Sequence, residues 1–314
     1  MFYKKVKQNQ LKNKKPISEK CKVTYVTLSI NTDGISVSKS TIKSHWSVFI
    51  VINKLPMDSR YKTENVILAG VFCFKTKPKF EKFLNPIIES LKKLEGGFRL
   101  LRLENTDPRE ICEVYLITIC ADKPAKSGLT NTVQYNGMFG CPYCKNPGKS
   151  LERRWVYSQT GTMTLKTSIG YNQNQNSASA QNPFLGIKGP SLFESLACVE
   201  HYKSFVIDYM HSVILGVGKK ILSCYFDKKF KNEPFSLLYN MNEIDNILQN
   251  LNYPQFVPRE CRDIFNYEKW KANQIRTFFL YVAVPLLESF IRPILVVKLS
   301  FGFFEPHQAC ADSL

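Results

Sequence analysis

The sequence predicts an α/β protein with a mixed sheet flanked by helices. Three strand-like runs come first, at 23–30, 46–52 and 66–74, and each is rich in β-branched or aromatic apolar residues. Residues 79–94 then follow helical spacing, and residues 111–121 return to a strand-like run. The order of three strands, one helix and a fourth strand is the main evidence for this fold class.

Each of these elements has its own local signal. The first strand is followed by Asp33 and Gly34, residue types that favour a turn, so we expect the strand to end there. Residues 46–52 are apolar apart from Ser47, which is typical of a buried central strand. In 79–94 the apolar residues share one helical side, and a glycine pair follows that can end the helix.

The chain divides into six predicted segments: a basic flexible arm (1–20), a core carrying the strands (21–135), a turn-rich knuckle (136–157), a polar loop (158–185), a helical insertion region (186–288) and a tail (289–314). Further helices are predicted at 208–226, 242–251 and 269–287 from their apolar spacing. The fold class is therefore α/β with a helical and knuckle-bearing insertion.

The charge of the chain predicts its partner. Of 314 residues, 43 are Lys or Arg and 26 are Asp or Glu, a net charge of +17. Such an excess favours nucleic acid, because lysines release counterions from phosphates. A basic surface with no dedicated partner is the alternative. Residues 1–20 hold seven lysines and one acid, and they could bind DNA, direct import or only solubilise the chain.

Cysteines and apolar runs predict the compartment. Ten cysteines are scattered along the chain without a secretory signal, which indicates a reducing compartment. No run reaches the roughly 18 apolar residues that a membrane-spanning helix requires. We therefore expect an intracellular, nuclear protein with no membrane partner.

Two acidic residues follow predicted strands, Asp33 after the first and Asp122 after the last. Mg²⁺ and Mn²⁺ prefer oxygen ligands, and two-metal phosphoryl transfer needs carboxylates that hold ions about 3.5–4 Å apart. Carboxylates at strand ends in this order of elements are typical of an RNase H-like fold. The alternative is that each Asp only forms a turn or caps a helix.

Two further pairs are candidate ligands. Cys141 and Cys144 have the spacing of half a zinc site, and two more ligands would be needed for a tetrahedral ion. They could equally be structural thiols. Asp208 and His211 lie one helical turn apart, which fits a ligand pair, an orienting hydrogen bond, or an N-capping Asp beside a packed His.

Several blocks together resemble one family. An Asp-Lys-Pro-Ala-Lys block at 122–126 precedes an Asn-Gly-Met-Phe-Gly-Cys-Pro-Tyr-Cys block at 136–144. Both are similar to blocks of the CACTA (En/Spm-like) transposase family, as are residues 31–34, 186–191 and 206–217. The blocks occur in the family's order, and the resemblance extends from about residue 23 to residue 288.

The resemblance implies a DDE/D-type transposase that cuts and joins DNA. It implies that Asp33 and Asp122 are the first two carboxylates for Mg²⁺ or Mn²⁺. It also implies that Cys141 and Cys144 are the cysteine half of a Zn²⁺ motif, with DNA as partner and a homo-oligomer as a further possibility.

Three departures from the family argue against activity. Lys123 replaces a small residue beside the second Asp, and the tail at 289–314 does not resemble the family's third acid or its His pair. Glu305 and His307 are the substitutes that the tail offers. The family's DNA-binding region before the core is also largely missing. We therefore expect a transposon-derived protein that is inactive as an isolated chain. The alternatives are an active transposase and a non-enzymatic zinc-knuckle module that binds DNA or protein.

Overall fold

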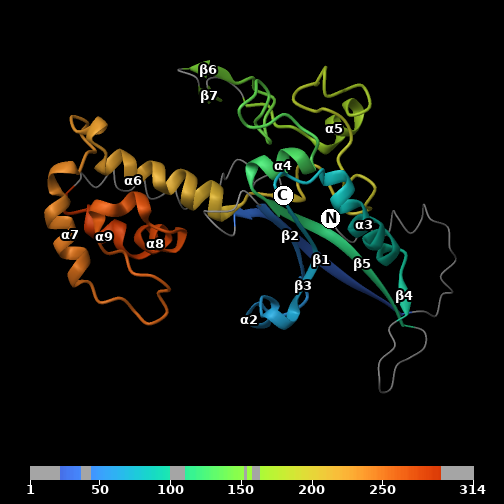
Figure 1. Ribbon diagram of the computed structural model, residues 1–314, viewed down its shortest axis with the longest axis horizontal. Coiled ribbons are helices and arrows are strands. Elements are labelled where there is room, and N and C mark those ends of the chain that lie inside the picture. Colours follow the sequence, from blue (N-terminus) through green and yellow to red (C-terminus); the bar gives the residue numbers. More distant parts are fainter. Residues whose placement is uncertain (1–21, 37–43, 100–109, 152–153, 158–162, 291–314) are drawn as a thin grey trace. The chain divides into compact units, whose positions relative to one another are not determined.

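A computed structural model describes residues 22–36, 44–99, 110–151, 154–157 and 163–290 (Figure 1). The chain forms two compact units, one up to Ile207 and one from Asp208 onward, and each is described by itself. Within the described ranges, no helix is both long enough and apolar enough to cross a membrane.

A mixed sheet forms the centre of the first unit. Its strands are β1 (Lys22–Ser36), β2 (Ser44–Ile52), β3 (Val66–Phe74), β4 (Phe98–Arg99), β5 (Glu110–Ala121) and β8 (Phe205–Val206). The order is β3-β2-β1-β5-β4, and β8 also pairs with β5. β5 lies parallel to β1 and to β8, whereas β2 is antiparallel to both of its neighbours. The predicted α/β class with a mixed sheet flanked by helices is confirmed.

Two helices pack on one face of this sheet (Figure 1). In α3 (Phe80–Glu95), the apolar spacing places Leu84, Ile88 and Leu91 in the core. In α4 (Lys123–Leu129), Ala125 and Leu129 join the same cluster and are fully buried. Because α4 begins directly after β5, this packing fixes where the last residues of β5 lie.

The first strand is longer than the sequence predicts, and the expected turn at Asp33 and Gly34 is wrong. Asp33 pairs with Ser47 and Gly34 pairs with Trp46 inside the β1–β2 ladder. A Cβ at Gly34 would lie 2.6 Å from the ring of Trp46. Gly34 therefore serves to admit the Trp46 ring, and pairing with β2 overrides the local turn preference.

The remaining elements of the first unit are short: α2 (Met57–Arg60), η1 (Thr63–Asn65), β6 (Lys149–Leu151), β7 (Arg154–Val156) and α5 (Ser168–Asn174). Helix α5 lies inside the polar segment for which the sequence predicts only a loop. Its Tyr171 is buried, donates to the Gly189 carbonyl at 3.1 Å and stacks on His201 with ring centres 3.5 Å apart. One buried ring is enough to order a helix that has little apolar periodicity.

The second unit is helical. It contains η2 (Tyr209–Gly218), α6 (Lys219–Phe226), η3 (Lys228–Phe230), η4 (Leu238–Asn240), α7 (Met241–Asn250), η5 (Ile264–Lys269), α8 (Ala272–Thr277), η6 (Phe278–Val282) and α9 (Ala283–Leu287). The predicted helices at 208–226, 242–251 and 269–287 correspond to these elements. Both η2 and η6 have π-helical winding, so the first and last predicted helices change their pitch along their length.

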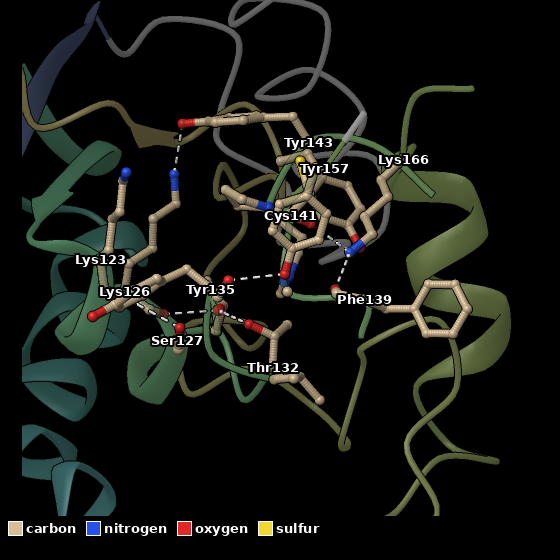
Figure 2. A pocket seen from close by; sticks show the side chains of 16 residues that line it. Lys123, Lys126, Ser127, Thr132, Tyr135, Phe139, Cys141, Tyr143, Tyr157 and Lys166 are labelled. Atoms are coloured by element: carbon tan, nitrogen blue, oxygen red, sulfur yellow. Dashed lines mark hydrogen bonds between the residues drawn. The ribbon is translucent and has the colours of Figure 1, made fainter. Parts of the chain in front are cut away.

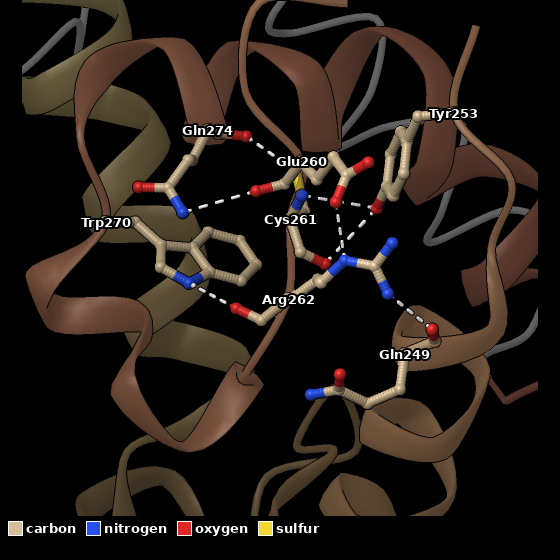
Figure 3. Close-up of polar contacts among 7 residues, drawn as sticks. All are labelled: Gln249, Tyr253, Glu260, Cys261, Arg262, Trp270 and Gln274. Carbon is tan, nitrogen blue, oxygen red and sulfur yellow. Dashed lines mark hydrogen bonds and ion pairs between the residues drawn. The ribbon is translucent and has the colours of Figure 1, made fainter.

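A polar network ties the loop before η5 to α7 and α8 (Figure 3). The fully buried Cys261 donates its thiol to the Gln274 carbonyl at 2.9 Å. Arg262 pairs with Glu260 at 2.6 Å, and Trp270 donates to the Arg262 carbonyl at 3.2 Å. The bonds from Cys261 and Trp270 satisfy backbone carbonyls of Gln274 and Arg262, whereas the Arg262–Glu260 pair joins two exposed side chains.

Candidate functional site

The register of β1 and β5 brings the two predicted acidic residues to neighbouring positions. The last paired residues of the two parallel strands are Thr32 and Ala121, and both are buried on the core side. Asp33 follows Thr32 directly, and Asp122 follows Ala121 directly. Asp33 continues β1, so its side chain belongs to the face opposite Thr32, whereas Asp122 lies directly after β5 and caps α4. Adjacent strands lie about 4.8 Å apart, so the two carboxylates share one end of the sheet.

Local hydrogen bonds orient both carboxylates. Asp122 Oδ1 accepts the backbone N–H of Ala125 at 2.7 Å and so caps α4. Asp33 Oδ1 accepts the backbone N–H of Gly34 at 2.7 Å. Each hydrogen bond involves one oxygen of its carboxylate, and both side chains are partly exposed. The capping role foreseen for Asp122 is therefore present, and it is compatible with metal binding by the other oxygen.

Two carboxylates supply part of the oxygen donor set that Mg²⁺ or Mn²⁺ takes. In the part of the chain that the structure describes, no group of three or more His, Cys, Asp or Glu side chains could hold a metal ion. Glu305 and His307 lie outside the described residues. Lys123 follows Asp122 directly, and its side chain is exposed.

A cavity of about 260 Å³ lies behind α4 (Figure 2). The described residues of its wall include three lysines and no acidic residue. Lys126 reaches from α4 across the pocket, where its ammonium donates to the Tyr143 hydroxyl at 3.0 Å and to the Phe205 carbonyl at 2.8 Å. Burial lowers the pKa of Lys126 to about 8.

A second lysine holds the opposite wall. Lys166 donates to the carbonyls of Phe139 at 3.2 Å and of Cys141 at 2.7 Å. Burial lowers its pKa as well. Tyr157 closes the same loop by donating its hydroxyl to the Tyr135 carbonyl at 2.8 Å. The knuckle is therefore held in shape by side chains from segments that follow it in the sequence.

The two predicted zinc ligands lie together in this knuckle. The backbone N–H of Cys144 donates to Cys141 Sγ at 3.4 Å, and Cys144 is buried. Burial and the contact with Cys141 raise the pKa of the Cys144 thiol. Among the described residues no further side chain completes a metal site around them.

The Asp208 and His211 pair forms as the sequence indicates, in the second unit. Asp208 Oδ1 accepts the backbone N–H of His211 at 3.1 Å and caps η2. Asp208 Oδ2 lies 2.5 Å from His211 Nδ1. Of the three interpretations, the cap and the orienting hydrogen bond both describe this contact, and a ligand role is not tested by it.

The sequence does not predict the lysine-lined pocket. Lys126 follows Asp122 by about one helical turn, which is a weak signal for a shared site. Lys166 lies in a polar segment without periodicity, and nothing in its surroundings in the sequence indicates that it reaches Cys141. His201 also lines the pocket, although the sequence gives it no partner.

Comparison with known protein families gives one match. Residues 6–168 match the model of a family described as transposase family tnp2, a stretch that covers more than half of the 314 residues. No curated protein matches the chain.

Proposed function

The chain belongs to transposase family tnp2, and from that premise we propose that it is a transposon-derived protein with a partial DDE/D transposase domain of the CACTA (En/Spm-like) type. The observation that carries the proposal is the adjacent placement of Asp33 and Asp122 by the parallel register of β1 and β5. Both lie within or directly after strands of one sheet, inside the stretch that matches the family.

The topology supports an RNase H-like fold for this domain. A meander of β1, β2 and β3 is followed by α3 and then by β5, which returns parallel to β1. The short β8 adds a further parallel strand beside β5. This arrangement places Asp33 of β1 beside the end of β5, which Asp122 follows.

The proposed mechanism assigns the chain's residues simple tasks. Asp33 and Asp122 would hold Mg²⁺ or Mn²⁺, whose chemistry when bound is to activate water or a 3′-hydroxyl and to stabilise the leaving oxygen. The Ala125 N–H fixes one oxygen of Asp122 and so orients its carboxylate. Lys123 places an ammonium beside this site, where it can neutralise a DNA phosphate.

We propose that the isolated chain is catalytically incomplete. Two carboxylates neutralise less of the charge of two divalent ions than three do, and the described residues offer no third acid to this site. The expected behaviour is DNA binding without cleavage. The net charge of +17 supports DNA as the partner, and a homo-oligomer is a further possibility of the family.

The test is a duplex-binding and nicking assay on the purified chain. Fluorescence anisotropy should detect duplex binding that weakens steeply as salt is raised, because phosphate contacts release counterions. No nicking of supercoiled DNA should appear with Mg²⁺ or Mn²⁺. Binding that ignores salt would contradict the phosphate-driven mode. Nicking by the wild type that Asp33→Ala abolishes would contradict incompleteness and show an active transposase.

A second candidate function rests on Cys141 and Cys144, whose N–H···S contact at 3.4 Å is compatible with a Zn²⁺ knuckle. In this proposal the chain is a non-enzymatic module that binds DNA or protein. Metal analysis of the purified chain should find about one zinc per chain, lost in Cys141→Ser together with part of its stability. Absence of zinc, with folding unaffected by a chelator, would leave the cysteines as structural thiols.

Nuclear localisation is proposed from the seven lysines in residues 1–20. A fluorescent fusion of the chain should accumulate in the nucleus, and replacement of those lysines by glutamine should spread it through the cell. An unchanged distribution would show that residues 1–20 do not act as an import signal.

A further inference from the structure

The pocket behind α4 has the charge of an anion site. Lys123, Lys126 and Lys166 line it, and no carboxylate is among the described residues of its wall. Within the described ranges, neither Lys126 nor Lys166 forms an ion pair; both donate to neutral oxygens. A buried ammonium without a counter-charge is costly, so a bound anion would stabilise this arrangement.

Aromatic side chains form a large part of the remaining wall. Tyr135, Phe139, Tyr143 and Tyr157 all line the pocket, and the ammonium of Lys126 lies 4.7 Å from the centre of the Tyr143 ring. Aromatic side chains bind unstacked bases through their faces, and this contact tolerates any sequence. Lysines beside rings are thus suited to a ligand that is both anionic and planar.

A buried imidazole adds an unused hydrogen-bonding group. His201 lines the pocket, is 8% exposed, and its Nδ1 has no hydrogen-bond partner among the described residues. Burial and the nearby Lys166 and Lys126 lower the pKa of His201 to about 3, so the ring is neutral. A neutral ring can donate or accept toward a polar ligand edge, whereas a cationic ring could only donate.

The size and position of the pocket further limit which ligands it can hold. An engineered cavity of about 150 Å³ accepts benzene, so a cavity of about 260 Å³ has room for one nucleobase and not for a base pair. Asp122 caps α4, and Lys123 and Lys126 of the same helix line the cavity. Asp122, one of the two proposed catalytic carboxylates, therefore lies within about one helical turn of the pocket residues Lys123 and Lys126.

We propose that this pocket binds one unstacked nucleotide of the DNA strand beside the cleavage site. The lysines contact its phosphate, and the tyrosine rings contact its base. The inference rests on the proposed function for the choice of DNA, but its test does not require catalysis.

The first experiment maps the contact. A single-stranded oligonucleotide of about 12 nucleotides, within the range of common single-strand sites, carries 5-iododeoxyuridine and is photo-crosslinked to the full chain. Mass spectrometry should find the crosslink at Tyr135, Tyr143 or Tyr157. Crosslinks confined to residues outside the pocket overturn the proposal.

The second experiment compares affinities for single-stranded and duplex DNA by fluorescence anisotropy. Lys126→Met should weaken single-strand binding roughly tenfold and duplex binding by less than about threefold, as expected when one base and its phosphate lose their contact. Lys149→Met is the matched control, since Lys149 is exposed and does not line the pocket. It should weaken both DNA forms equally and by less than about threefold.

A variant that leaves the fold intact guards against misfolding of Lys126→Met. Lys123 lines the pocket from an exposed position, so Lys123→Met should keep the fold and weaken single-strand binding about threefold. Equal losses for Lys123→Met and Lys149→Met on both DNA forms overturn the pocket, while intact duplex binding still supports the proposed function. If the wild type binds neither form, both proposals fail.

Discussion

The carboxylate of Asp122 accepts the backbone N–H of Ala125 at 2.7 Å, so the residue that follows β5 also begins α4. Through this one contact, the strand that carries a candidate metal ligand and the helix that carries two pocket lysines are joined without a loop. A change at Asp122 therefore acts on stability and on the site at the same time, and suitable variants can separate the two effects.

Replacement of Asp122 by alanine should cost about 1 kcal/mol of the free energy of unfolding, because α4 loses its N-cap. Asp122→Asn should cost much less, since asparagine caps helices about as well as aspartate. Urea unfolding of the three proteins measures the difference. Equal stability of all three would show that the cap contributes nothing to the fold.

The packing of α4 on the sheet depends on a glycine. A Cβ at Gly128 would lie 2.6 Å from the ring of Phe80, which packs edge-on against Trp46 with ring centres 5.2 Å apart. Gly128→Ala should therefore destabilise the first unit by about 1–3 kcal/mol through overpacking.

Gly170→Ala in α5 is the control for this change. Its Cβ would meet only the Thr167 hydroxyl, at 3.2 Å, and we expect a change within about 0.5 kcal/mol. Thermal or urea unfolding would reveal both effects. A neutral Gly128→Ala would mean that Phe80 moves freely and that α4 is not fixed by this contact.

Stability should fall as the pH rises through the titration of Glu95. Its carboxylate accepts the Ala197 N–H at 3.1 Å, and burial raises its pKa from 4.5 to about 7. The folded state then holds a proton that the unfolded state has lost, so this contribution is fully present below about pH 4.5 and is lost by about pH 7. Urea midpoints across this range measure it.

Glu95→Gln should remove this part of the pH dependence, because the amide stays neutral. Glu81→Gln, at an exposed position of the same helix, should leave it in place. If the wild type and Glu95→Gln vary identically with pH, Glu95 does not titrate as its burial indicates.

Patterns of apolar residues were enough to predict the four long strands, α3 and the main helices of the second unit. The runs at 46–52 and 66–74 became β2 and β3 almost to the residue, and 79–94 became α3. The turn at Asp33 was wrong because pairing with Ser47, a contact between distant parts of the sequence, decides that position. The residues next to Asp33 in the sequence do not indicate that partner.

The site was predicted in part for the same reason. Asp122 could be placed at the end of a strand because that strand has a clear pattern of its own. Lys166 reaches Cys141 from a polar segment, and only the folded chain brings the two together. A long side chain from a weakly patterned segment produces no periodic signal, so the sequence does not predict the pocket.

Metal-directed cleavage of the protein can show whether Asp33 and Asp122 form one divalent-metal site. Fe²⁺ takes the place of Mg²⁺ and reduces added hydrogen peroxide to hydroxyl radicals that cut the backbone near the bound ion, while ascorbate returns the iron to Fe²⁺. We expect fragments that are cut near residues 33 and 122. Excess Mg²⁺ should suppress them, and they should be absent in both Asp33→Asn and Asp122→Asn. Cuts elsewhere only, or cuts that persist in both variants, would contradict it.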